Sequence, residues 1–254
     1  MTRTFAITNQ KGGVGKTTTA VNLAASLGAA KRRVLLVDLD PQGNATMGSG
    51  LDKRTLQSSV YQLLIGAETI RQVRVRAPAA EYDLLPANRE LAGAEVEMVE
   101  LERRETRLKE ALAEIEDEYD FVLIDCPPAL NLLTVNALAA AHAVVIPMQC
   151  EYYALEGLSD LVSTVKKVRG HLNPDLQIEG LLRTMYDPRN TLAQQVSAQL
   201  VQHFGDKVYR TLVPRNVRLA EAPSYGVPAV LWDASSKGAQ AYVALASEIL
   251  GRAA

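Results

Sequence analysis

The residues best suited to chemistry lie in a glycine-rich loop near the N-terminus. Residues 9–18 read Asn-Gln-Lys-Gly-Gly-Val-Gly-Lys-Thr-Thr and follow the phosphate-binding template G-x-x-x-x-G-K-[ST], with Gln10 replacing the first glycine. Because glycines have no Cβ, consecutive backbone N–H groups can turn inward around an anion. Lys16 is predicted to contact the β- and γ-phosphates, and Thr17 to offer its hydroxyl to Mg²⁺. An extra lysine, Lys11, stands near the start of the loop.

Three aspartates follow apolar runs that have the character of buried strands. Asp125 ends the run 121–125, where an acidic residue of a phosphate-loop site holds Mg²⁺ directly or through water. Asp38 and Asp40 lie at the end of another run, before a turn, and alternation points both in a similar direction. We assign Asp40 to the metal side and to orienting the attacking water, with Asp38 supporting it. The opposite assignment of this pair stays open.

These side chains need elements that bring them together. A strand over 4–8 and a helix over 18–28 would place the phosphates at a helix N-terminus, where the dipole favours negative charge. Strand-like and helix-like segments alternate along the chain, which predicts an α/β fold with a mainly parallel, twisted sheet and helices on both faces. Further strands are expected at 34–38, 81–86, 121–125, 143–147, 177–182 and 207–211. Helices are expected at 91–115 (exposed, and broken or bent around 99–100), 155–169, 192–204 and 239–250.

Composition limits the class of protein. The 254 residues suit a single domain over 1–254, and 48% hydrophobic with 22% charged residues is ordinary for a globular chain. The net charge of −2 is uneven, because acidic residues dominate 81–120 and basic residues the later part. This pattern fits a polyanion partner on one face, or simply two solvated helix faces. The two cysteines have no metal-ligand spacing, and no signal peptide or membrane-length apolar run is seen, so we expect a cytoplasmic protein.

The motifs together resemble a known family. Residues 11–18, the stretch 37–44 (Val-Asp-Leu-Asp-Pro-Gln-Gly-Asn) and 124–128 (Ile-Asp-Cys-Pro-Pro) are similar to those of deviant Walker A P-loop ATPases, and within them of ParA/Soj. The likeness continues through 147–157 and 213–218 and covers nearly the whole chain. It implies a P-loop NTPase fold that binds ATP and Mg²⁺. The implied ATP-binding residues are Lys11, Gly12, Gly13, Val14, Gly15, Lys16, Thr17, Thr18, Pro214 and Asn216, with Pro214 and Asn216 at the adenine.

The resemblance also implies partners. ATP-bound ParA/Soj proteins are expected to form sandwich homodimers in which the signature lysine, here Lys11, reaches the partner's phosphates, as an arginine finger does in trans. Such a dimer binds nucleoid DNA without sequence preference, and a ParB-like centromere-binding protein stimulates hydrolysis. Arg189, Arg218 and Lys237, all in expected loops or turns, are the predicted DNA contacts.

Two other functions compete with DNA segregation. A MinD-like membrane-positioning ATPase would need a basic amphipathic C-terminal helix, but Arg252 is the only basic residue in 239–254. An iron–sulfur ATPase of the nitrogenase iron-protein type would hold a cluster with cysteines. Cys126 and Cys150 lie outside any glycine-rich cluster loop, and free buried thiols are the better interpretation. We therefore expect no membrane partner and no cluster.

Overall fold

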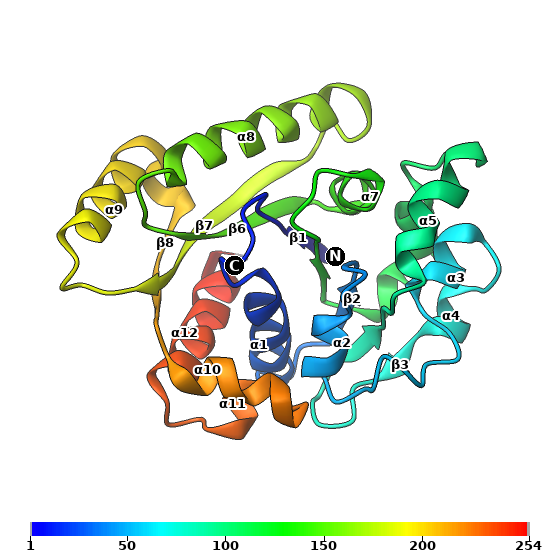
Figure 1. Ribbon diagram of the computed structural model, residues 1–254, viewed down its shortest axis with the longest axis horizontal. Coiled ribbons are helices and arrows are strands. Elements are labelled where there is room, and N and C mark those ends of the chain that lie inside the picture. The colour runs from blue at the N-terminus through cyan, green and yellow to red at the C-terminus, as the bar shows by residue number, and fades with distance from the viewer. Residues whose placement is uncertain (1, 253–254) are drawn as a thin grey trace.

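The architecture is an eight-stranded sheet with the order β3-β4-β2-β5-β1-β6-β7-β8. The computed structural model describes residues 2–252 (Figure 1). The β3–β4 pair is antiparallel and the other pairs are parallel, so the predicted mainly parallel α/β fold is confirmed. The strands are β1 Arg3–Ile7, β2 Val34–Asp38, β3 Val75–Arg76, β4 Asp83–Leu85, β5 Phe121–Asp125, β6 Ala143–Gln149, β7 Gln177–Tyr186 and β8 Val208–Pro214.

Helices cover both faces of this sheet. In Figure 1, α7, α8 and α9 lie on one side of the central strands, and α1, α11 and α12 lie on the other. The helices are α1 Lys16–Ala29, α2 Asn44–Gly48, α3 Val60–Ile65, α4 Ile70–Val73, α5 Leu91–Glu97, α6 Arg107–Ala113, α7 Leu132–Ala140, α8 Ala154–His171, α9 Thr191–Phe204, α10 Val217–Glu221, α11 Ala229–Trp232 and α12 Lys237–Arg252. Short 3₁₀ turns occupy 98–100, 116–118, 205–207 and 222–225.

The two layers enclose two apolar cores, and the strands supply both. Along β5, Val122 and Ile124 face the core under α7 and α8, whereas Phe121 and Leu123 face the core under α1 and α12. A strand buried on both faces needs apolar residues at every position. This is why β2 and β5 appear in the sequence as continuous apolar runs, each ending in an aspartate at the carboxyl edge.

The prediction for residues 91–115 is partly wrong. The helical segment does break near 99–100, but helix ends at Glu97, a 3₁₀ turn follows, and helix resumes only at Arg107. The segment is also not simply exposed, since Leu91 and Leu108 are fully buried. The side chain of Asn136 in α7 accepts from the Leu108 N–H and donates to a carbonyl upstream, which fixes the start of α6.

Strands β7 and β8 extend beyond their predicted ends at the carboxyl edge of the sheet. β7 continues to Tyr186 and β8 to Pro214, so both reach the carboxyl edge of the sheet. Lys237, expected in a turn, is the first residue of α12, and Arg218, expected in a loop, lies in α10.

Candidate nucleotide site

The glycine loop joins β1 to α1 at the carboxyl edge of the sheet. Gly13 and Gly15 have φ values of +73° and +87°, a backbone region that side chains with a Cβ rarely adopt. A Cβ placed on Gly12 or Gly13 would meet no described heavy atom within 4 Å, so the loop borders open space. Helix α1 begins at Lys16 without a side-chain cap, which leaves its first N–H groups free for an anion.

Lys16 lies beneath this loop, almost fully buried at 7% exposure. Its Nζ donates to the carbonyl oxygen of Lys11 at 3.1 Å. Burial lowers the pKa of Lys16, and the nearby carboxylates of Asp125 and Asp40 oppose that shift. A buried ammonium held by one carbonyl at the end of a helix is suited to receive the charged oxygens of a phosphate.

Asp125 provides the observation that best fits a metal ion. Its side chain is fully buried, and neither carboxylate oxygen has a well-formed hydrogen bond within residues 2–252. Burial, followed by the charge of Asp38, raises its pKa well above the ordinary value, whereas the Thr17 hydroxyl and Lys16 act in the opposite direction. A buried carboxylate without a partner is costly unless a cation completes it. The oxygen set of Asp125, Thr17 and Asp40 suits Mg²⁺, which prefers such ligands.

The two aspartates at the end of β2, Asp38 and Asp40, differ in burial and in hydrogen bonding. Asp38 is fully buried: one oxygen accepts from the Thr46 N–H and hydroxyl, both at 2.7 Å, and the other from the Asp40 N–H at 3.2 Å. Burial raises its pKa to about 6, against those hydrogen bonds. Asp40 is partly exposed and accepts only the Gln42 N–H, at 2.9 Å, within the described chain. Asp38 therefore anchors the turn, while Asp40 is the carboxylate with free acceptor capacity toward the loop.

A cavity of about 180 Å³ brings the predicted adenine-contacting residues to the loop. Pro214 and Asn216 line it together with Gly15 and Thr18. Asn216 also caps α10, accepting from the Leu219 N–H at 3.4 Å, so its position is fixed by the helix it begins.

Sequence reasoning missed further residues of this cavity, namely Thr184, Met185 and Tyr242. Thr184 donates to the Val14 carbonyl at 2.7 Å, which ties β7 to the glycine loop. Met185 has φ +48°, and its sulfur accepts from the Gln149 side chain at 2.7 Å. The local signal was weak, because Thr184 follows the predicted strand 177–182 only after a charged residue, Arg183.

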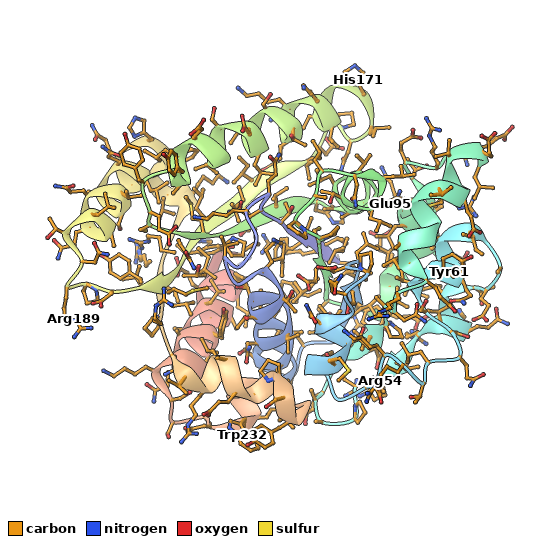
Figure 2. The ribbon with its side chains drawn as sticks, in the orientation of Figure 1. Arg54, Tyr61, Glu95, His171, Arg189 and Trp232 are labelled. Carbon is orange, nitrogen blue, oxygen red and sulfur yellow. The ribbon has the colours of Figure 1, made fainter. Side chains whose placement is uncertain are left out.

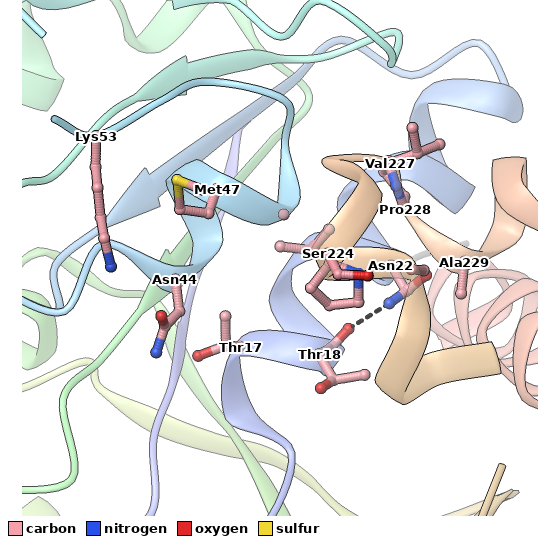
Figure 3. Close-up of a pocket in the computed structure, with 14 residues that line it drawn as sticks. Thr17, Thr18, Asn22, Asn44, Met47, Lys53, Ser224, Val227, Pro228 and Ala229 are labelled. Atoms are coloured by element: carbon pink, nitrogen blue, oxygen red, sulfur yellow. Dashed lines mark hydrogen bonds between the residues drawn. The ribbon is translucent and has the colours of Figure 1, made fainter. Parts of the chain in front are cut away.

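A second cavity, of about 490 Å³, lies on the other side of the first turn of α1 (Figure 3). Thr17 and Thr18 border it, with Asn44 and Lys53 on the α2 side and the segment 222–229 opposite. The Asn22 side chain, which also lines this cavity, donates to the Thr18 carbonyl at 2.9 Å. The site is therefore open on both sides of Thr18.

The side chain of Lys11 pairs with Glu151, whereas its backbone carbonyl accepts from Lys16 in the phosphate loop. The Lys11 ammonium lies 2.5 Å from the Glu151 carboxylate, and the two side chains are 46% and 50% exposed. An ion pair this exposed contributes little stability and exchanges partners readily.

The three predicted DNA contacts lie on separate elements. Arg189, in the turn between β7 and α9, projects outward in Figure 2 and pairs with Asp187 at 2.9 Å. Arg218, in α10, pairs with Glu221 at 2.9 Å and Asp233 at 3.2 Å. Lys237 is exposed at the start of α12.

The cysteines are both free and buried. Burial raises the pKa of Cys150 to about 11 and also raises the pKa of Cys126. Within residues 2–252, no three His, Cys, Asp or Glu side chains are grouped to hold a metal. No described helix is long and apolar enough to cross a membrane.

Comparison with known proteins agrees with this geometry. Residues 2–178 match the family described as AAA domain. The sporulation initiation inhibitor protein Soj of Bacillus subtilis is 53% identical, covering 98% of each chain. The chromosome partitioning protein ParA of Caulobacter vibrioides is 50% identical, covering 98% of this chain and 94% of its own.

Solved structures share the fold. The crystal structure titled cobyrinic acid a,c-diamide synthase from Mycobacterium smegmatis, with bound ADP and magnesium, is 41% identical with a TM-score of 0.86, covering 98% of this chain and 94% of its own. The glycine loop, the buried acidic strand end and these similarities agree on ATP and Mg²⁺ as the ligands. The chain belongs to the ParA/Soj family of partitioning ATPases, within the deviant Walker A P-loop superfamily.

Proposed function

We propose that this ATPase segregates DNA. Its ATP-bound homodimer binds double-stranded DNA without sequence preference, and hydrolysis stimulated by a ParB-like centromere-binding protein releases it. The observation that best supports the dimer is the exposure of the Lys11 side chain. Lys16 already supplies the buried phosphate lysine, whereas the Lys11 ammonium is half exposed and, among residues 2–252, forms an ion pair only with exposed Glu151. A second subunit's phosphates can compete for such a lysine. The Caulobacter relative is named a chromosome partitioning protein, which supports this role. The proposed function acts in the cytoplasm and on the nucleoid.

Within one subunit the loop residues 11–18 cradle the phosphates, and Lys16 neutralises their charge. Thr17, Asp40 and Asp125 hold Mg²⁺, which when bound neutralises charge on the phosphate oxygens. Asp40 orients the attacking water, because it is partly exposed and its acceptor capacity is not used up as that of Asp38 is. Pro214 and Asn216 contact the adenine in the 180 Å³ cavity, called the base cavity below.

Arg189, Arg218 and Lys237 form the proposed DNA face. The arginines are ion-paired in this structure, but their side chains are 88% and 50% exposed. Exposed pairs contribute little to stability, so phosphates can replace the neighbouring carboxylates. A dimer doubles these contacts and therefore doubles the slope of log affinity against log salt.

The MinD-like alternative depends on a free amphipathic helix at the C-terminus. In α12 the apolar residues Tyr242, Leu245 and Ile249 are buried in the core that α12 shares with α1. This favours a structural role for the helix over a membrane-binding one.

Co-sedimentation tests the proposal directly. The protein is mixed with DNA or with anionic liposomes, each with ATP and with ADP. We expect DNA binding with ATP, little with ADP, and none to liposomes. Binding to liposomes with ATP, or equal DNA binding with both nucleotides, would contradict the proposed function.

A further inference from the structure

Strands β7 and β8 pair with an irregular register close to the nucleotide site. Two steps along β7, from Leu181 to Arg183, match four steps along β8, from Val208 to Leu212. Strand β8 therefore bulges over residues 209–211. The bulge comes directly before the segment that lines the base cavity, so its geometry decides where that segment lies.

Glu248 of α12 binds the backbone N–H groups of this bulge. Its carboxylate accepts from the Arg210 N–H at 2.8 Å, the Thr211 N–H at 3.0 Å and the Thr211 hydroxyl at 2.8 Å. Arg252, one turn later, donates to it at 3.1 Å. Burial raises the pKa of Glu248, but these donors outweigh burial and hold it below its ordinary value.

Arg183 of β7 binds a backbone carbonyl of the same bulge. It is 9% exposed, and its guanidinium donates to the Tyr209 carbonyl at 2.7 Å and to the Ser197 hydroxyl of α9 at 2.7 Å. A buried guanidinium costs free energy, which its hydrogen bonds must offset. Here the planar fork of donors joins a backbone carbonyl of the bulge to the helix packed against it.

Without the side chains of Glu248 and Arg183, the bulge would lose the hydrogen bonds that stabilise it. Its N–H and carbonyl groups would lack partners, and regular pairing of β8 with β7 would compete. Between the pairs Arg183–Leu212 and Tyr186–Pro214, β7 in turn has one residue more than β8. Regular pairing from Leu181–Val208 onward would therefore move the end of β8 by one residue, about 3 Å, since a strand rises roughly 3.3 Å per residue. Pro214 and Asn216 would then leave their places beside Gly15 and Thr18.

We propose that Glu248 and Arg183 are positioning residues for the nucleotide base. By holding the bulge of β8 they set Pro214 and Asn216 against Thr18, without touching the nucleotide. This inference rests on the assignment of the base cavity made above. Helix α12 connects the bulge to the base cavity, because Glu248 binds the bulge and Tyr242 of the same helix lines the cavity.

The test compares a ligand that has a base with one that has none. Affinities for ATP and for inorganic tripolyphosphate, each with Mg²⁺, are measured by calorimetry in the parent protein, Glu248→Ala, Glu248→Gln and Ser247→Ala. We expect Glu248→Ala to weaken ATP roughly ten-fold and tripolyphosphate less than about two-fold. Glu248→Gln keeps one acceptor oxygen and should fall between. Ser247→Ala, an exposed neighbour, should match the parent.

The outcomes separate the two claims. A parent protein that binds ATP no more tightly than tripolyphosphate would contradict the base cavity itself. A parent that prefers ATP, with that preference unchanged in both Glu248 variants, would overturn the positioning role. Equal loss of both ligands in Glu248→Ala would also overturn it, because a purely structural residue would have that effect.

Discussion

Asp38 and Asp40 stand two residues apart, yet hydrogen bonds give them different capacities. Asp38 has three donors on its two buried oxygens and anchors the turn through Thr46. Asp40 retains acceptor capacity at the mouth of the site. Variants at the two positions should therefore fail for different reasons, the first in folding and the second in chemistry.

Asp40→Ala should accumulate an ATP dimer, because phosphate binding is intact while the water loses its orienting carboxylate. Size-exclusion chromatography with ATP and Mg²⁺, beside a hydrolysis assay, measures this. Asp38→Ala leaves the Thr46 donors unsatisfied and should instead lower the free energy of unfolding by about 1–3 kcal/mol. Hydrolysis at the parent rate in Asp40→Ala would remove Asp40 from its role.

The two lysines of the loop should also differ. Lys16→Ala removes the cation from the bound phosphates, so ATP binding by the monomer should fall. Lys11→Ala should leave that binding nearly unchanged and abolish dimerisation. Glu151→Gln frees Lys11 from its ion pair and serves as a comparison that keeps the lysine. Equal loss of monomer affinity in both lysine variants would argue against a contact across subunits.

At the scale of elements, α10 and α12 meet at a glycine. A Cβ on Gly238 would lie 2.6 Å from Cγ of Leu219 and 3.1 Å from Cβ of Asn216. Gly238→Ala should therefore displace α10, weaken ATP binding and cost about 1–3 kcal/mol of stability. Gly251→Ala, later in α12 with no described atom within 4 Å, is the matched control. Urea unfolding and ATP titration measure both, and parent-like behaviour of Gly238→Ala would contradict this packing argument.

Elements with a continuous apolar run and a polar end were predictable. β2 and β5 match their predicted bounds, because both faces are buried and each ends in an aspartate at the carboxyl edge. The 91–115 segment was harder, since the side chain of Asn136, distant in sequence, decides where α6 begins. The bulge in β8 could not be predicted either, because its partners Arg183 and Glu248 come from β7 and α12.

The same contrast applies to the site. The glycine loop and Asp125 follow from local motifs, whereas the two cavities beside Thr18 depend on how separate segments pack. The Lys11–Glu151 pair joins residues 140 positions apart and has no local signature. Metal coordination, the adenine contacts and the single-domain assignment over 1–254 stay predictions.

For the whole molecule, the proposed DNA face implies a salt dependence. In the ATP dimer Arg218→Glu removes one phosphate contact from each subunit, so the slope of log affinity against log salt should flatten by about 0.9 for each contact. Affinity should fall equally for unrelated DNA sequences, and ATP-driven dimerisation should persist. Filter binding over a salt series measures this for Arg218→Glu and Arg189→Glu.

Arg54→Glu is the control for these variants. Arg54 pairs with Asp52 at 2.8 Å, is 78% exposed, and lies right of centre in Figure 2, far from Arg189 at the left edge. Unchanged affinity and slope in both test variants, or an equal change in the control, would reject the proposed face.

The two edge strands of the sheet, β3 and β8, affect how readily the protein aggregates. An open strand edge is a template on which another chain can add a strand and begin a fibril. Here β3 is only two residues long and antiparallel, and Glu248 occupies two N–H groups of β8. Crowded copies therefore find little backbone to pair with at either border. We therefore expect concentrated protein to resist fibril formation through its strand edges.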